Sequence, residues 1–364
     1  MSMETSHDFL SIVLDERPLI DVRAPIEFQK GAFKHAVNLP IMNDEERHVV
    51  GIKYKEDGNA AATDLGYNLV SGEVKASRVK AWIQFIEENP TAMLYCFRGG
   101  SRSRISQEWL HDAGKDIIRL EGGYKAFRHY LLSELMPRAQ KAKPIILGGC
   151  TGSGKTLILK DLKNAIDLEA IAHHRGSSFG HHIDEQPTQI DFENNLAYAL
   201  IQHKSKGYKH VILEDEGKNV GKRFLPTDLV AHYKTGDYVI VEVPLEERVQ
   251  ITLQEYVIES QAHHIERFGK DKGLKIWYDY ILASMHRLEK RFGGDRLKIV
   301  VELFIEAYDT QMSSGTYICH EPWITMFLRD YYDPMYNFQM SKVQHHVVFR
   351  GNRDDVHSYL EALD

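Results

Sequence analysis

Two loops that are built to surround an anion, residues 96–102 and 149–156, constrain the fold of this chain more than any other feature. The first has a cysteine followed by glycines and arginines, and the second matches the pattern GxxxxGK[ST] in full. A thiolate ringed by backbone N–H groups suits transfer of a sulfur-like or phosphate-like group, whereas a loop ending in Lys-Thr suits a bound di- or triphosphate. The combination predicts an enzyme.

The composition predicts a globular protein of two domains. The chain has 364 residues, of which 43% are hydrophobic, so it is too long to form only one hydrophobic core of ordinary size. Its three cysteines are widely spaced and include no CxxC pair, which argues against a disulfide framework or a thiolate zinc site. The net charge of −7 argues against general attraction to nucleic acid. Because no apolar run resembles a signal peptide or a membrane span, we expect a cytoplasmic protein without a membrane partner.

The first domain is expected at residues 1–136. Between residues 43 and 72 the sequence is polar and lacks clear periodicity, so we expect an inserted functional loop there, with Lys53-Tyr54-Lys55 as a basic contact. Short strands alternate with helices in the rest of this domain. The strands are expected at 19–22, 33–40, 91–95 and 117–120, and the helices at 74–88, 103–113 and 125–135.

The second domain is expected at residues 144–364, after a basic linker at 137–143. Apolar strands alternate with helical patterns in its first half, which predicts a doubly wound α/β sheet. We expect a helical subdomain at about 245–332, then a last strand near 347–350 and a closing helix. The earlier strands are expected at 144–147, 211–213 and 238–243, with a helix at 157–165 directly after the phosphate loop.

Cys96 is the expected nucleophile, because it ends a strand and its loop precedes a helix whose N-terminus favours anions. This environment should lower the pKa of the thiol. A structural cysteine buried at a strand end is the alternative, although burial alone would not require the arginines and glycines that follow. The expected anion loop comprises Arg98, Gly99, Gly100, Ser101 and Arg102.

In the second loop, Lys155 should reach terminal phosphates, and Thr156 should ligate Mg²⁺ where that ion is bound. Adjacent histidines occur at 173/174, 181/182, 263/264 and 345/346, but no cysteine or carboxylate set completes a metal site, so no protein-held metal is expected. The phosphate-binding residues are expected to be Gly149, Thr151, Gly152, Ser153, Gly154, Lys155 and Thr156. A substrate loop with Arg175, Gly176, Ser177 and Phe179, and the acidic residues Glu214 and Glu216, are candidate additions, with a plain surface loop and a solvated strand end as the alternatives.

The N-terminal half resembles a rhodanese domain, through Leu19-Ile20-Asp21-Val22-Arg23, Ala36-Val37-Asn38-Leu39-Pro40 and the Cys96 loop. In that family the loop cysteine carries a persulfide. The Cys-x5-Arg loop is one residue longer than the usual rhodanese loop and is similar to that of rhodanese-like dual-specificity phosphatases, which hold a tetrahedral phosphate. We therefore hypothesise that this loop accepts a phosphate-bearing donor such as selenophosphate.

The combination of this domain with a P-loop domain resembles the tRNA 2-selenouridine synthase family. The resemblance rests on the two loops together with residues 174–180 and Glu214-Asp215-Glu216. It implies a transferase that S-geranylates wobble 2-thiouridine of tRNA with geranyl diphosphate and then installs selenium from selenophosphate, with Cys96 required for selenation. It implies these co-substrates and no tightly bound cofactor.

Two other classes of protein fit the residues alone. One is a Cys-x5-Arg phosphatase or a sulfurtransferase fused to a nucleotide-binding domain, and hydrolysis of an aryl phosphate by Cys96 would favour the phosphatase. The other is a sensor whose two loops merely report their ligands. An aromatic such as Phe179 could stack on an extruded base of a tRNA partner.

Overall fold

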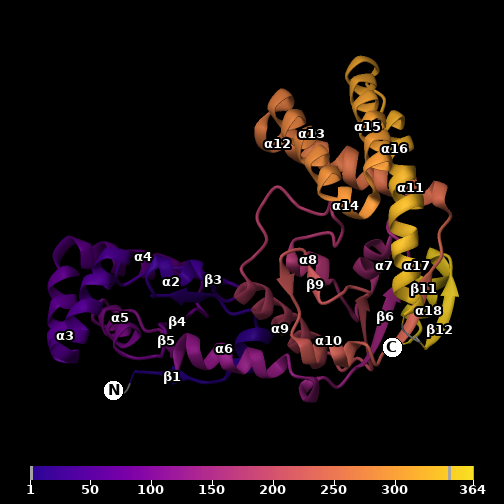
Figure 1. Cartoon of the computed structure of the whole chain (residues 1–364). Helices are drawn as coiled ribbons and strands as arrows, with labels where there is room; N and C mark the ends of the chain where they lie inside the picture. Colours follow the sequence, from indigo (N-terminus) through magenta and orange to yellow (C-terminus); the bar gives the residue numbers. More distant parts are fainter. Residues whose placement is uncertain (1–2, 343–345, 364) are drawn as a thin grey trace. The chain divides into compact units, whose positions relative to one another are not determined.

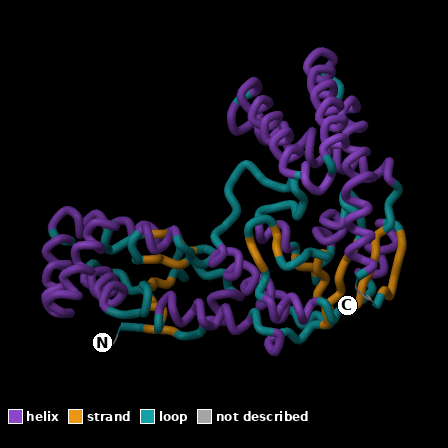
Figure 2. Tube along the Cα trace, in the orientation of Figure 1, coloured by secondary structure: helices purple, strands orange, loops and turns teal. Residues whose placement is uncertain are grey.

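The chain forms two compact units, which are described separately. In this computed structural model, residues 3–342 and 346–363 are described. The first unit contains residues 1–140 and 187–207, and the second contains residues 141–186 and 208–364. Figures 1 and 2 show a parallel sheet with helices in each unit, so the predicted α/β fold class is confirmed.

The first unit is built on a parallel five-stranded sheet of order β1-β5-β4-β2-β3. β4 is the central strand and is buried along its whole length. The strands are β1 Thr5–Ser6, β2 Leu19–Asp21, β3 Ala36–Asn38, β4 Met93–Tyr95 and β5 Ile118–Leu120. The helices are α1 Phe9–Leu14, α2 Pro25–Gln29, α3 Asp44–Leu69, α4 Gly72–Glu88, α5 Ser101–Asp112, α6 Gly123–Glu134 and α9 Gln189–Ser205.

Helix α3 replaces the aperiodic loop that was expected between residues 43 and 72, and that expectation is wrong. Asn43 caps the helix by accepting from the backbone N–H of Glu46, whose carboxylate accepts from the N–H of Asn43 in return. Gly58 interrupts the helix with φ +82°. Ala62 is the one described residue of α3 that is buried, which explains why the sequence shows no apolar stripe.

Helix α9 lies in the first unit, although the predicted boundary assigned its residues to the second domain. Its apolar side chains pack on α1 and α6, where the ring of Tyr198 lies 6.1 Å from that of Phe127. Buried Asn194 donates to the carbonyl of Ala32 and accepts from Arg128. The first core is therefore completed by a segment that follows the phosphate loop in the sequence.

The second unit has a parallel sheet of order β12-β11-β6-β8-β7. Its central strand β6 leads into the phosphate loop. The helix after that loop ends at Asp161, earlier than predicted, because β7 begins at Ala165. The strands are β6 Lys143–Gly148, β7 Ala165–Ile166, β8 His210–Glu214, β9 Asn219–Val220, β10 Arg223–Phe224, β11 Asp237–Val241 and β12 Val347–Gly351.

The helical subdomain has its own apolar core around Trp277, Phe304 and Trp323 (Figure 1). It follows β11, as predicted, and the chain then returns to the sheet through β12 and a closing helix. The helices of this unit are α7 Lys155–Asp161, α8 Leu168–Ala172, α10 Thr227–Tyr233, α11 Leu245–Leu253, α12 Ser260–Phe268, α13 Lys270–Arg287, α14 Glu289–Phe292, α15 Gly294–Ser314, α16 Glu321–Phe327, α17 Asp333–Ser341 and α18 Arg353–Glu361.

Candidate active site

Cys96 directly follows β4, at the carboxyl edge of the first sheet, where ligands of open α/β folds bind. Its thiol is 3% exposed and lies 3.1 Å from the hydroxyl of Ser103 in the first turn of α5. The hydroxyl of Ser103 also donates to the carbonyl of Gly100. Strand, loop and helix therefore hold the sulfur at the N-terminus of α5, as the sequence predicted.

The backbone of the Cys96 loop turns its carbonyl groups toward neighbouring elements. The N–H groups of Tyr124 and Lys125, in α6, donate to the carbonyls of Cys96 and Phe97 over 2.8 and 2.9 Å. Arg119 donates to the carbonyl of Gly99. Within the described chain, the N–H groups of residues 97–102 have no protein acceptor. A row of free donors at a helix N-terminus forms an anion cradle.

Glycine is required where α6 meets this loop. A Cβ on Gly123 would lie 2.3 Å from the carbonyl oxygen of Cys96 and 2.4 Å from the nitrogen of Gly99. Gly123 also has φ +57°, and Gly99 has φ +65°. The close approach of these backbones fixes the curl of the loop, and Gly123 was not identified from the sequence.

The two arginines of the loop differ in their environment. Arg102 forms a two-pronged ion pair with Glu27, with contacts of 2.6 and 3.2 Å. Burial opposes ionisation of Glu27, but its bonds to Arg102 prevail and lower its pKa. Arg98 is exposed and has no ion pair with any described residue, so its charge is available to a bound anion. Arg102 instead serves partly to anchor the loop to α2.

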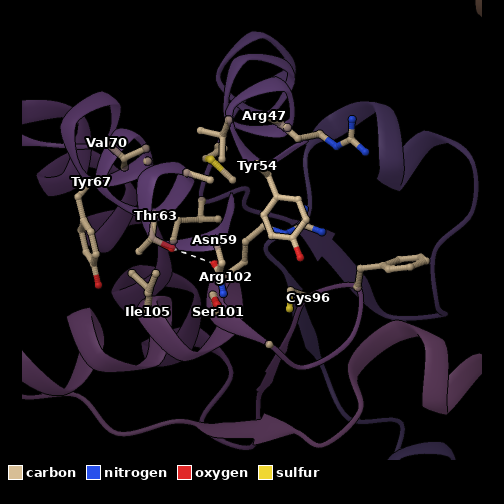
Figure 3. A pocket seen from close by; sticks show the side chains of 18 of the residues that line it. Arg47, Tyr54, Asn59, Thr63, Tyr67, Val70, Cys96, Ser101, Arg102 and Ile105 are labelled. Atoms are coloured by element: carbon tan, nitrogen blue, oxygen red, sulfur yellow. Dashed lines mark hydrogen bonds between the residues drawn. The ribbon is translucent and has the colours of Figure 1, made fainter. Parts of the chain in front are cut away.

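A pocket of about 610 Å³ opens beside Cys96 (Figure 3). Its floor is the Cys96 loop together with Ile105 and Trp109 of α5, and α3 forms its other wall. In Figure 3, Tyr54 extends from α3 toward the loop. The lining is mostly apolar. This pocket was not predictable from the sequence pattern, because the residues of α3 show no helical periodicity.

The second loop joins β6 to α7. The ammonium of Lys155 donates to the carbonyl of Gly149 over 2.8 Å, so it curls back over its own loop. Gly149, Gly152 and Gly154 all have φ values near or above +75°, and Cβ atoms on the first two would collide with Val241 and Thr252. This is the compact conformation expected of a loop whose amides surround phosphate.

Helix α11 of the helical subdomain contacts the phosphate loop. Buried Arg248 donates to the carbonyl of Thr151 over 3.2 Å and makes two bonds of 2.7 Å to Asp333. The hydroxyl of Ser153 is buried without a protein partner. Arg248 and Asp333 thus fix the loop geometry, and neither was identified from the sequence.

Three carboxylates converge beside the phosphate loop. Glu169, Glu214 and Glu216 place oxygen atoms within 4.8 Å of one another, and Glu169 accepts a 3.5 Å bond from the hydroxyl of Thr156. Burial and the proximity of Glu216 raise the pKa of Glu169 to about 8. Burial, followed by the charge of Glu169, raises the pKa of Glu214 well above its ordinary value. Glu214 and Glu216 were predicted, whereas Glu169 was missed because α8 is distant in sequence.

The predicted substrate loop folds tightly over these carboxylates. Gly176 has φ +58°, and a Cβ there would lie 2.4 Å from Glu169 and 2.6 Å from Glu216. The hydroxyl of Ser177 lies 2.9 Å from that of Tyr256, and Arg175 donates to the carbonyl of Glu255. The loop is therefore packed onto the helical subdomain and is not a plain surface loop.

Phe179 is buried in the core of the helical subdomain. It is 6% exposed and packs against Phe327 at 5.3 Å, within the helical core. The ring therefore supports the loop from inside in this structure, and base stacking by Phe179 stays a prediction.

The adjacent histidines pair across this loop. The ring of His173 lies 4.4 Å from that of His182, and the ring of His174 lies 4.8 Å from that of His181. Among the described residues, the one cluster suited to a metal is the carboxylate set. His345 lies outside the described residues.

The other two cysteines have environments that favour the neutral thiol. Burial and the charge of Asp333 raise the pKa of Cys150, which lies in the phosphate loop. Burial raises the pKa of Cys319 as well. Cys96 lies in the cradle of free amide donors before α5, which makes it the candidate nucleophile.

Comparison with known proteins finds one family model in each half of the chain. Residues 6–130 match the model of the rhodanese-like domain. Residues 142–364 match the model described as the tRNA 2-selenouridine synthase AAA domain. The chain belongs to the tRNA 2-selenouridine synthase family.

Curated relatives of the tRNA 2-selenouridine synthase family match over nearly their whole length. The tRNA 2-selenouridine synthase of Sulfurovum sp. (strain NBC37-1) is 54% identical, over 98% of this chain and 98% of the relative. The synthase of Hydrogenovibrio crunogenus is 47% identical over the same shares, and that of Shewanella denitrificans is 46% identical. This chain is accordingly an enzyme that selenates tRNA. No helix within the described residues is long and apolar enough to span a membrane.

Proposed function

We propose that the two loops carry the two halves of one modification of wobble 2-thiouridine in tRNA, performed in the cytoplasm. The phosphate loop binds geranyl diphosphate for S-geranylation, and the Cys96 loop binds selenophosphate for the exchange of sulfur for selenium. The observation that carries this division is the pair of anion cradles, each after the central strand of its own sheet.

The chemistry needs these steps in this order. Sulfur of 2-thiouridine attacks the geranyl carbon, a C–S bond forms, and the C–O bond to diphosphate breaks. Diphosphate leaves and takes up the N3 proton of the base. Diphosphate is held by the amides of residues 149–156, with Lys155 available to neutralise its charge. Alkylation makes the sulfur a leaving group.

Selenium then replaces the alkylated sulfur. The thiolate of Cys96 attacks C2 of the base, the C2–S bond to the geranyl sulfur breaks, and geranyl thiol leaves after taking the proton of hydrogen selenophosphate. The selenium of the resulting selenophosphate trianion then attacks C2 and releases the thiolate of Cys96. Water attacks phosphorus, the Se–P bond breaks, and 2-selenouridine and inorganic phosphate result. The free N–H groups of residues 97–102 and Arg98 suit the trianionic donor.

The carboxylate set beside the phosphate loop fits a Mg²⁺ ion. Glu214 has a buried oxygen without a partner among the described residues, and its neighbours Glu169 and Glu216 supply further oxygen ligands of the type that Mg²⁺ prefers. Thr156 would complete the set. A bound ion would offset charge on the diphosphate leaving group.

The test is a nucleoside analysis by mass spectrometry after incubation with 2-thiouridine tRNA, geranyl diphosphate and selenophosphate. Wild type should give 2-selenouridine, Cys96→Ala should stop at the S-geranyl nucleoside, and Lys155→Ala should leave 2-thiouridine. Full geranylation by Lys155→Ala would remove the phosphate loop from the first step. Hydrolysis of an aryl phosphate by Cys96 without any selenation would favour a phosphatase.

A further inference from the structure

The pocket beside Cys96 combines three properties that a mere anion site does not require. It is large enough for a ligand of drug-like size, it opens at the nucleophile, and its surface is mostly apolar. Selenophosphate is small and fully charged, so it gains nothing from apolar walls. The pocket therefore suits a second, apolar group that reacts at the same place.

Helix α3 presents apolar side chains to this opening without burying them in a core. Tyr54 is 58% exposed, Ile52 44% and Tyr67 41%, and all three line the pocket. Exposed apolar groups that gather in one concave site mark a binding surface. A ligand with an apolar chain would cover them.

Cationic groups lie at the same pocket. Lys55 and Arg98 are exposed and line it, and neither forms an ion pair with the residues that the structure describes. Such charges suit the phosphates that flank a nucleotide. The expected basic contact at residues 53–55 thus lies on α3, with Lys55 and Tyr54 at the pocket.

We propose that this pocket holds the apolar chain carried by the sulfur of the alkylated wobble base, so that α3 selects the S-prenylated nucleotide and places its C2–S bond beside Cys96. This inference rests on the proposed function and adds the binding site for the chain. Each methylene that the pocket buries should tighten binding about fourfold at most.

The experiment measures equilibrium binding, without selenophosphate, of fluorescent anticodon-stem oligonucleotides whose wobble base carries S-methyl or S-geranyl. Gly66→Phe is the informative variant. Gly66 lines the pocket, has helical backbone, and has no atom within 4 Å of the position of its Cβ, so phenylalanine adds bulk without strain. Gly294→Phe is the matched control, because Gly294 also lies in a helix with open space but is not among the residues that line the pocket.

Wild type and Gly294→Phe should bind the S-geranyl oligonucleotide at least about thirtyfold more tightly than the S-methyl one, and Gly66→Phe should reduce that ratio at least about tenfold. Thermal melting verifies that both variants fold. An equal affinity of wild type for the two oligonucleotides, or an unchanged ratio in Gly66→Phe, would overturn the inference. If the ratio behaves as expected but selenophosphate gives no 2-selenouridine, the proposed function fails while the pocket assignment stands.

Discussion

At the scale of single residues, the candidate site depends on close backbone contacts and buried charges that are not visible in the sequence. The motifs identified Cys96 and Lys155 because the residues that define each motif are close neighbours in the sequence. They did not identify Gly123 or Glu169, since each contacts a loop that is distant in the chain. Local sequence patterns predict the reactive groups well. The residues that position those groups come together only through tertiary packing, so local patterns do not reveal them.

Gly123→Ala should distort the Cys96 loop. Its φ of +57° strains any L residue by about 1–2 kcal/mol, and the new Cβ would also collide with the carbonyl of Cys96. We expect selenation of pre-geranylated tRNA to fall at least about tenfold, while geranylation of 2-thiouridine tRNA is retained. The control is Gly114→Ala, which has φ +78° but open space around its Cβ and should cost stability alone. Equal selenation rates in the two variants would refute the role of this contact.

Glu169→Gln should change stability in a pH-dependent way. Because the folded pKa of Glu169 is about 8, the folded protein binds a proton that the unfolded chain releases near pH 4.5, so stability is lost as pH rises between these values. In EDTA, the stability of the variant relative to wild type should therefore be about 2 kcal/mol greater at pH 8 than at pH 6. Thermal unfolding at both pH values measures this.

The second part of that experiment repeats the thermal unfolding with Mg²⁺ added. Wild type should gain stability from the ion, more strongly at pH 8 than at pH 6, since the carboxylates must lose their protons to bind it. Glu169→Gln should lose most of this gain, and exposed Glu185→Gln should behave as wild type. A Mg²⁺ response that is identical in Glu169→Gln and wild type would show that the ion does not bind at this cluster.

At the scale of elements, strands and amphipathic helices were predictable, and α3 and the placement of α9 were not. Helix α4 carries an apolar face toward the core, which periodicity reveals. The apolar residues of α3 line an open pocket, so periodicity gives no signal; the capping pair Asn43 and Glu46 was the available clue. The attachment of α9 depends on contacts with residues far earlier in the chain.

Asn194→Ala tests the attachment of α9 to the first unit. The change leaves the carbonyl of Ala32 and the guanidinium of Arg128 without their bonds to Asn194 in a buried setting. It should reduce the free energy of unfolding of that unit by about 2–3 kcal/mol, measured by urea titration. Gln202→Ala, which removes an exposed bond to Glu16 from the same helix, should cost at most about 0.5 kcal/mol. Similar losses in the two variants would contradict the attachment.

At the scale of the whole molecule, the sequence motifs predicted two α/β sheets, each with an anion loop after a strand, and the structure has that arrangement. The structure adds that this strand is the central one in each sheet. In the proposed function, the two loops carry two reactions that need different surroundings. Diphosphate departure needs positive charge and amides, whereas selenation of an alkylated base also needs room for an apolar chain. We therefore assign the two reactions to two different loops of one chain.

Single-turnover selenation of pre-geranylated tRNA by selenophosphate tests this claim most directly, with Lys155→Ala compared with Cys96→Ala. Because the first step is bypassed, Lys155→Ala should form 2-selenouridine within about threefold of the wild-type rate, and Cys96→Ala should be slower by at least about a hundredfold. If both variants fail, or if Cys96→Ala reacts as fast as wild type, the assignment of the two reactions to two separate loops is contradicted.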